Sequence, residues 1–290
     1  MKLVLNGHDE RYVVEQGMLN LFPGERPVYE PIGPGDDSWA VVTLREDDRC
    51  HVTVELCFRG KSLPYSLDVP LVGDEFQREG IRRRAIGKCF FLAARALTGH
   101  TPPWGMLTGV RPVKLPTRAL LSGATPLQAK QELREEYYVS PDRAALAVDC
   151  AQASIAAQRS LKEGEVSLYL GIPFCPTRCA YCSFVSADVG RTLTLVEPYV
   201  DALLKEIDGT ARVLTESGRT IRSFYMGGGT PTTLSARQLD RVLTRCEQVL
   251  PLEGCTELTV EAGRPDTINR EKLEVLRAHG VGRVSINPRR

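Results

Sequence analysis

The chain has 290 residues, of which 42% are hydrophobic and 25% are charged. This composition is that of an ordinary globular protein, and the length allows two domains with a core each. The 37 Lys and Arg residues nearly balance the 36 Asp and Glu residues, which leaves a net charge of +1. The balance argues against a nucleic-acid partner, and no apolar run predicts a membrane span or a secretory signal. We therefore expect a cytoplasmic protein.

The first half of the chain, residues 1–161, predicts an α+β domain. Runs of β-branched or alternating apolar residues predict strands, and the last three of them form an antiparallel meander. The expected strands are 3–5, 39–44, 51–58 and 62–69. Apolar residues at helical spacing, preceded in two cases by the N-caps Thr125 and Ser140, predict helices. The expected helices are 11–21, 76–97, 116–121, 126–136 and 141–161.

The second half, residues 162–290, predicts strands that alternate with helices. The expected strands are 167–172, 223–226, 257–261 and 283–286, and the expected helices are 195–215, 236–249 and 270–279. Such alternation is typical of parallel βα units with right-handed crossovers. We therefore expect an α/β fold, in which the first four βα units of a partial (β/α) barrel follow the α+β N-terminal domain. The strands are short and apolar, so we expect them to be buried on both faces.

The most informative segment is the loop Cys175-Pro176-Thr177-Arg178-Cys179-Ala180-Tyr181-Cys182. Three thiols in this spacing can each bind one iron of a four-iron cluster and leave the fourth iron open. S-adenosylmethionine can ligate that iron, and one electron then cleaves it to a 5'-deoxyadenosyl radical. The alternatives are a structural zinc site and a disulfide framework. Zinc needs four ligands, usually in two pairs, and an odd total of nine cysteines is unlike a disulfide framework.

Other candidate residues lie where predicted strands end, which is where parallel βα sheets bind ligands. Gly227-Gly228-Gly229-Thr230-Pro231 follows the second strand, and its backbone can receive the ammonium group of a methionine. Glu261 closes the third strand and can accept hydrogen bonds from an amino acid or a ribose. Tyr169 and Tyr181 precede and enter the cysteine loop, where they can face a cofactor. A flexible turn, a surface glutamate and core tyrosines are the structural alternatives.

The segments Leu168–Cys175, Cys175–Cys182 and Gly227–Pro231 together resemble the radical SAM superfamily, specifically its coproporphyrinogen dehydrogenase branch. The resemblance covers residues 165–288. Within the branch the chain is most similar to the HemZ-like group, because Gly171 stands where the HemN and HemW groups usually have histidine. The segment Glu261–Asp266 also departs from those groups, and Trp104–Lys114 is similar to HemZ-like chains.

The resemblance implies a 4Fe-4S cluster and S-adenosylmethionine as cofactors. The implied cluster ligands are Cys175, Cys179 and Cys182, and the implied S-adenosylmethionine contacts are Tyr169, Tyr181, Gly228, Gly229, Thr230 and Glu261. The implied reaction is the oxygen-independent decarboxylation of coproporphyrinogen III to protoporphyrinogen IX in haem biosynthesis, with an external electron donor and acceptor. A HemW-like haem chaperone with the same site is the alternative. The barrel of the relatives continues further, so we expect a C-terminally truncated chain with low activity.

The remaining cysteines are expected to be small core residues. They are Cys50, Cys57, Cys89, Cys150, Cys246 and Cys255. We expect the segment Trp104–Lys114 to be an interdomain packing loop, and capture of a substrate carboxylate by Arg111 or Lys114 is the alternative. A third hypothesis, in which the N-terminal half is an RNA-binding or protein-binding module, is disfavoured for RNA by the neutral net charge.

Overall fold

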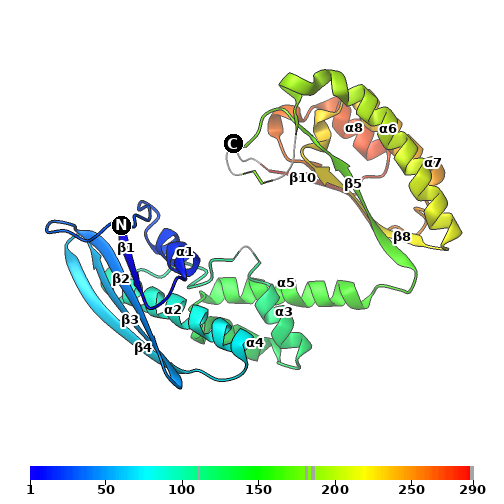
Figure 1. Ribbon diagram of the computed structural model, residues 1–290. Coiled ribbons are helices and arrows are strands. Elements are labelled where there is room, and N and C mark those ends of the chain that lie inside the picture. Colours follow the sequence, from blue (N-terminus) through cyan, green and yellow to red (C-terminus); the bar gives the residue numbers. More distant parts are fainter. Residues whose placement is uncertain (110, 180–181, 184–186, 288–290) are drawn as a thin grey trace. The chain divides into compact units, whose positions relative to one another are not determined.

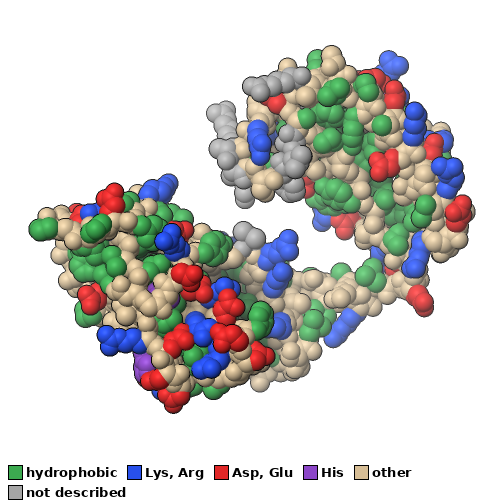
Figure 2. All heavy atoms as spheres, viewed as in Figure 1, with side chains coloured by type: hydrophobic (Ala, Val, Ile, Leu, Met, Phe, Trp, Pro, Cys, Tyr) green, Lys and Arg blue, Asp and Glu red, His purple; other side chains and the backbone are tan. Residues whose placement is uncertain are grey.

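The structure, a computed structural model, describes residues 1–109, 111–179, 182–183 and 187–287. The chain divides into two compact units, Met1–Arg159 and Ser160–Arg290 (Figure 1). Each unit has a hydrophobic core of its own. On the face shown in Figure 2, basic and acidic side chains are interspersed over both units. No helix of the described residues is long and apolar enough to cross a bilayer.

Unit 1 contains a four-stranded sheet in the order β1-β2-β3-β4. The strands are β1 (Lys2–Asn6), β2 (Ser38–Glu46), β3 (Arg49–Phe58) and β4 (Lys61–Pro70). The predicted antiparallel meander is confirmed for β2, β3 and β4, whereas β1 pairs in parallel with β2. Arg59 and Gly60 join β3 to β4 with φ values of 52° and 74°. Two positive φ values are what a type I′ hairpin requires.

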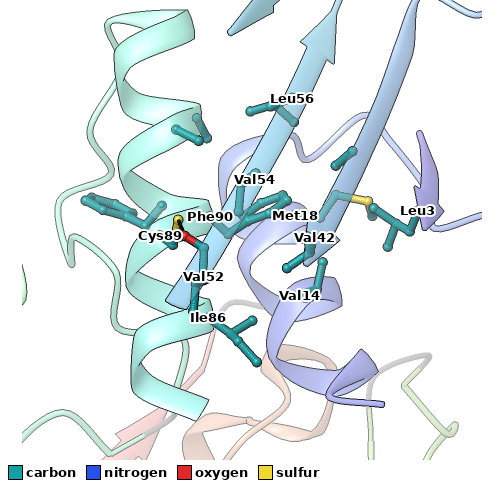
Figure 3. Close-up of a cluster of buried hydrophobic side chains, with 14 of the residues drawn as sticks. Leu3, Val14, Met18, Val42, Val52, Val54, Leu56, Ile86, Cys89 and Phe90 are labelled. Carbon is teal, nitrogen blue, oxygen red and sulfur yellow. Dashed lines mark hydrogen bonds between the residues drawn. The ribbon is translucent and has the colours of Figure 1, made fainter. Parts of the chain in front are cut away.

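Two helices, α1 (Arg11–Leu21) and α2 (Glu75–Thr98), pack against one face of this sheet. Figure 3 shows apolar side chains of both helices pointing toward those of the strands, among them Val14, Met18, Ile86, Phe90, Val42, Val52 and Val54. Asp74 and Gln77 form a capping box at the start of α2, and Gly99 ends the helix in the left-handed conformation. Local signals therefore fix both ends of the longest helix of this unit.

Three further helices form a smaller cluster in unit 1. They are α3 (Lys114–Leu121), α4 (Pro126–Glu135) and α5 (Pro141–Arg159). The predicted N-cap Thr125 is confirmed, and together with Gln128 it forms a capping box on α4. Helix α3 begins two residues before the predicted start, because Pro116 lies in its first turn, where proline is tolerated.

The predicted core position of the remaining cysteines holds for four of the six. Cys50, Cys57, Cys89 and Cys246 are buried, and Cys255 is half-buried. The prediction is wrong for Cys150, which is exposed. On α5 the buried residues are Ala144, Ala147, Val148, Ala151 and Ile155, and Cys150 lies off this stripe.

Unit 2 is a parallel sheet with helices between successive strands. The strands are β5 (Glu165–Ile172), β8 (Thr220–Gly228), β9 (Glu257–Ala262) and β10 (Arg283–Ile286), and the helices are α6 (Val189–Glu216), α7 (Ala236–Val249) and α8 (Arg270–Ala278). Consecutive strands are neighbours in the sheet, in the order β10-β9-β8-β5. All three pairings are parallel, so the predicted α/β fold is confirmed. Helix α6 begins before its predicted start, but its geometry is non-helical at Thr192.

The two faces of this sheet differ. Leu170, Ile172, Phe224, Met226 and Val260 pack in the core of unit 2. The opposite face carries polar and aromatic side chains, including Tyr169, which is 59% exposed. The prediction that the strands are buried on both faces is therefore wrong for the described residues. Side chains alternate between faces along a strand, and here one face is polar.

Candidate functional site

The cysteine loop begins where β5 ends. Cys175 is the second residue of β6 (Phe174–Cys175), a short strand that pairs in parallel with β7 (Ala187–Asp188). The amide of Gly229 donates a hydrogen bond to the carbonyl of Ile172 at 2.7 Å, and the amide of Thr230 donates to that of Phe174 at 2.8 Å. These bonds attach the carboxyl end of β8 to the start of the cysteine loop.

The glycine triplet makes this attachment sterically possible. A Cβ atom on Gly229 would lie 2.7 Å from the carbonyl oxygen of Phe174 and 3.0 Å from that of Ile172. Gly228 has a φ of 105°, which side chains disfavour. The amides of Gly229 and Thr230 are bonded within the protein. A ligand ammonium group is a hydrogen-bond donor, so backbone carbonyls at this edge would receive it. The roles of Gly228, Gly229 and Thr230 toward S-adenosylmethionine stay predictions.

All three loop cysteines are free and half-buried. The Sγ atom of Cys175 lies 3.4 Å from the hydroxyl oxygen of Thr230. The amide of Cys182 donates to the carbonyl of Cys179 at 3.0 Å. Tyr181, predicted to face a cofactor, lies outside the described residues.

The donor set suits an iron-sulfur cluster, although the described residues include no three Cys, His, Asp or Glu side chains gathered closely enough to hold a metal ion. Thiolates are the protein ligands of such clusters, and hydrogen bonds to the sulfur atoms tune their potential. The structure offers two such donors, the hydroxyl of Thr230 beside Cys175 and the guanidinium of Arg264 beside Cys179. A tetrahedral zinc site would need a fourth ligand.

Arg264 is a site residue that the sequence reasoning missed. Its Nη1 atom donates to the hydroxyl of Thr177 at 2.8 Å and lies 3.8 Å from the Sγ atom of Cys179. Asp266 holds the other side of the guanidinium at 2.9 and 3.1 Å, and this hydrogen bonding raises the pKa of Arg264. Its position three residues after Glu261, just beyond a strand end, is the only signal of this role in the sequence.

On the polar face of the sheet, three side chains from three strands lie together. The hydroxyl of Tyr225 donates to Oε1 of Glu261 at 2.6 Å. The rings of Tyr169 and Tyr225 are stacked, with centroids 5.9 Å apart. A Cβ atom on Gly227 would lie 2.9 Å from the hydroxyl of Tyr169 and 3.2 Å from Oε2 of Glu261. The absence of a side chain at Gly227 therefore leaves room between these groups.

The ionisation of this group follows from its contacts. The hydrogen bond to Glu261 raises the pKa of Tyr225 to about 12. Burial, and then the charge of Glu261, raise the pKa of Tyr169. Both phenols are therefore neutral near neutral pH. The second carboxylate oxygen of Glu261, Oε2, has no hydrogen-bond partner in the described part of the chain. Tyr225 was missed by the sequence reasoning, although its two-residue spacing from Gly227 places it on the same face.

Known proteins resemble this chain in two ways. Residues 169–288 match the model of the radical SAM superfamily. The chain is 33% identical to the oxygen-independent coproporphyrinogen-III oxidase-like protein HemZ of Bacillus subtilis (strain 168), over 99% of this chain and 59% of that protein. An anaerobilin synthase of Escherichia coli O157:H7 is 31% identical over 55% of this chain and 36% of its own length. The heme chaperone HemW of Lactococcus lactis subsp. lactis (strain IL1403) is 38% identical over 41% of this chain and 29% of its own length. The chain thus spans less than two thirds of the length of each of these relatives.

Proposed function

We propose that the chain is a radical SAM oxidoreductase that decarboxylates coproporphyrinogen III without oxygen; the match of residues 169–288 to the radical SAM superfamily supports the first part of this proposal. The observation that supports the proposal best is the attachment of the cysteine loop to the glycine triplet, through Gly229 and Thr230. It brings three candidate cluster ligands to the carboxyl edge of a parallel sheet, beside a backbone that only glycine permits. The HemZ-like protein, similar over 99% of this chain, supports the choice of substrate.

In this proposal Cys175, Cys179 and Cys182 hold a 4Fe-4S cluster, and S-adenosylmethionine binds beside them. Bound together, the two cofactors supply a radical that abstracts a hydrogen atom. The hydroxyl of Thr230 would donate a hydrogen bond to the sulfur of Cys175 when Cys175 is a thiolate, and Arg264 places a positive charge beside the sulfur of Cys179. Both contacts stabilise thiolates, which the cluster requires.

The polar face of the sheet would orient S-adenosylmethionine. Glu261 offers Oε2 as an acceptor for an ammonium or ribose hydroxyl group, while Tyr225 holds Oε1. The stacked rings of Tyr169 and Tyr225 offer an apolar platform beside it. Gly228 and Gly229 keep side chains away from the same edge.

The substrate loses a hydrogen atom from the β-carbon of a propionate, then carbon dioxide and one electron, and becomes a vinyl group. The reaction needs an external electron donor for the cluster and an external acceptor for the last electron. We place it in the cytoplasm, because nine free cysteines and an oxygen-sensitive cluster suit a reducing compartment.

The test is anaerobic reconstitution with iron and sulfide, followed by assay for 5'-deoxyadenosine with and without coproporphyrinogen III. We expect S-adenosylmethionine to change the electron paramagnetic resonance spectrum of the reduced cluster, and substrate to increase 5'-deoxyadenosine. Cys175→Ala should abolish both signals. Cys150→Ala, which removes an exposed cysteine outside the loop, should abolish neither. Equal loss in the two variants would contradict the proposal.

A HemW-like haem chaperone is the second candidate, and similarity to HemW over 41% of this chain supports it. HemW-like chains usually carry histidine where this one has Gly171. A Cβ atom on Gly171 would lie 3.5 Å from the ring of Tyr169, an ordinary contact, so packing does not impose glycine there. Titration with haem, followed by visible absorption, separates the candidates, because a chaperone should bind haem without consuming S-adenosylmethionine.

A further inference from the structure

A groove of about 860 Å³ lies beside α3 in unit 1, outside the radical SAM domain. Three basic side chains line it, namely Arg111, Lys114 and Arg118. Three hydroxyl groups and four apolar side chains complete the lining: Thr117, Ser122, Ser154, Pro112, Val113, Leu115 and Leu121. No carboxylate of the described residues contributes to it.

The positive charge of this groove is uncompensated. None of its three cations forms an ion pair with a described residue, whereas Arg82 in the same unit pairs with both Glu46 and Glu75. Lys114 and Arg118 are four residues apart on α3 and share one side of the helix. Like charges at this spacing repel each other. The chain therefore concentrates cations where nothing within the described unit balances them.

The position of Lys114 on α3 is also unfavourable. Lys114 is the first residue of the helix, and no acidic residue lies in the first turn. Cations at the amino end oppose the helix dipole. The carbonyls of Arg111 and Pro112 already accept the amides of Lys114 and Leu115, so side chains rather than helix amides would bind an anion. Residues that lower the stability of their own helix are expected where they serve a function, such as binding a ligand.

The apolar lining narrows the ligand class. Leu121 is 58% exposed beside the cations, and the volume is in the range that holds a small organic molecule. An inorganic anion would leave this apolar surface in water. We propose that the groove binds an amphipathic polycarboxylate, a tetrapyrrole whose propionates pair with Arg111, Lys114 and Arg118. This inference rests on the proposed function, from which it takes the tetrapyrrole.

The test uses the full chain without its cluster and coproporphyrin III, the coloured, oxidised form of the substrate with the same propionates. We expect saturable binding that weakens with salt. The groove triple variant should bind at least ~30-fold more weakly, because three charge-assisted contacts are lost. A control triple variant removes the same charge from exposed positions elsewhere in unit 1 and should bind within about twofold of the parent. The groove variant is R111Q/K114Q/R118Q, and the control is K61Q/R84Q/R134Q.

Two further measurements separate a lost ligand site from a lost fold. The groove triple variant should melt close to the parent temperature, since it removes one cation, Lys114, from the positive end of α3 and another, Arg118, from its last turn, and the two effects on the helix oppose each other. The variant R111K/R118K, which keeps the charge, should retain most of the binding. The methyl ester of coproporphyrin, which lacks carboxylates, should not compete.

Equal binding by the groove and control triple variants would overturn the inference, as would tight binding of the ester or no binding by the parent chain. Loss of transfer-RNA binding in the groove variant with porphyrin binding intact would assign the groove to nucleic acid instead. A failure of the proposed reaction can be told apart from a failure of this inference, because 5'-deoxyadenosine formation without substrate tests the cysteine loop, whereas porphyrin binding to the chain without its cluster tests the groove. Porphyrin binding that depends on the groove would support this inference even if no 5'-deoxyadenosine formed.

Discussion

Replacing Gly229 with alanine tests whether close packing explains the glycine triplet. The new Cβ atom would lie 2.7 and 3.0 Å from the carbonyl oxygens of Phe174 and Ile172, which are backbone atoms and cannot rotate away. Gly227→Ala is the matched control, because its Cβ atom would meet the ends of side chains, including the hydroxyl of Tyr169 at 2.9 Å. The two substitutions add the same methyl group two residues apart.

The expected difference follows from these contacts. Overpacking costs about 1–3 kcal/mol, and the displaced strand end weakens two backbone hydrogen bonds worth about 1 kcal/mol each. We therefore expect Gly229→Ala to lower the free energy of unfolding of unit 2 by about 2–4 kcal/mol. Gly227→Ala should cost less than about 1 kcal/mol, since side chains can rotate to accept the methyl group.

Urea unfolding can assign the change to one unit. Both tryptophans, Trp39 and Trp104, lie in unit 1, so their fluorescence follows that unit, whereas circular dichroism follows both. Gly229→Ala should shift only the transition seen by circular dichroism, and it should lower iron uptake on reconstitution. If Gly229→Ala and Gly227→Ala unfolded at the same urea concentration, the packing argument would be wrong.

Three other substitutions address the site and its surroundings. Arg264→Gln removes a positive charge and a donor beside the Cys179 sulfur, so an anaerobic redox titration should show a lower reduction potential, whereas Arg264→Lys should keep most of it. Tyr225→Phe removes the donor to Glu261 and should lower the stability of unit 2 by about 1 kcal/mol; an unchanged urea midpoint would contradict this. Burial lowers the pKa of His279, but hydrogen bonds to two carboxylates of α7 outweigh it and raise the pKa above 6.5. The charged form then stabilises the fold fully below pH 6.5, and this contribution is lost as pH rises through the folded pKa. His279→Gln should therefore destabilise more at about pH 5.5 than at about pH 9, by about 1 kcal/mol or less, and equal effects would refute the assignment.

Elements with strong local signals could be predicted from the sequence. The observed bounds of α7, Ala236–Val249, equal the predicted ones, because Ser235 and Gln238 form a capping box at its start. The predicted bounds of α1 and β10 are likewise those of the structure. Alternation of short strands with helices sufficed to predict the parallel sheet of unit 2, since such connections have few other solutions.

Features that depend on contacts between distant segments could not be predicted. The parallel pairing of β1 with β2 joins residues that are more than 30 positions apart, and nothing in either strand specifies its partner. The contact between Arg264 and the cysteine loop spans 85 positions. The polar face of the sheet in unit 2 went unnoticed because the strands are apolar on average, although Tyr169 and Tyr225 occupy paired positions of one face.

The arrangement of the site explains why each of its motifs could be predicted from the sequence, whereas the hydrogen bonds between the motifs could not. The ends of β5, β8 and β9 supply the cysteine loop, the glycine triplet and Glu261 with Arg264, in that order along the chain. Because these strands are parallel, their three ends lie at one edge of the sheet, and because consecutive strands are neighbours, the three ends are adjacent. Each motif is therefore readable as the residues that follow a strand. The hydrogen bonds between motifs depend on the register of each strand in the sheet. A shift of β8 by one residue would turn Tyr225 away from Glu261 and toward the helices.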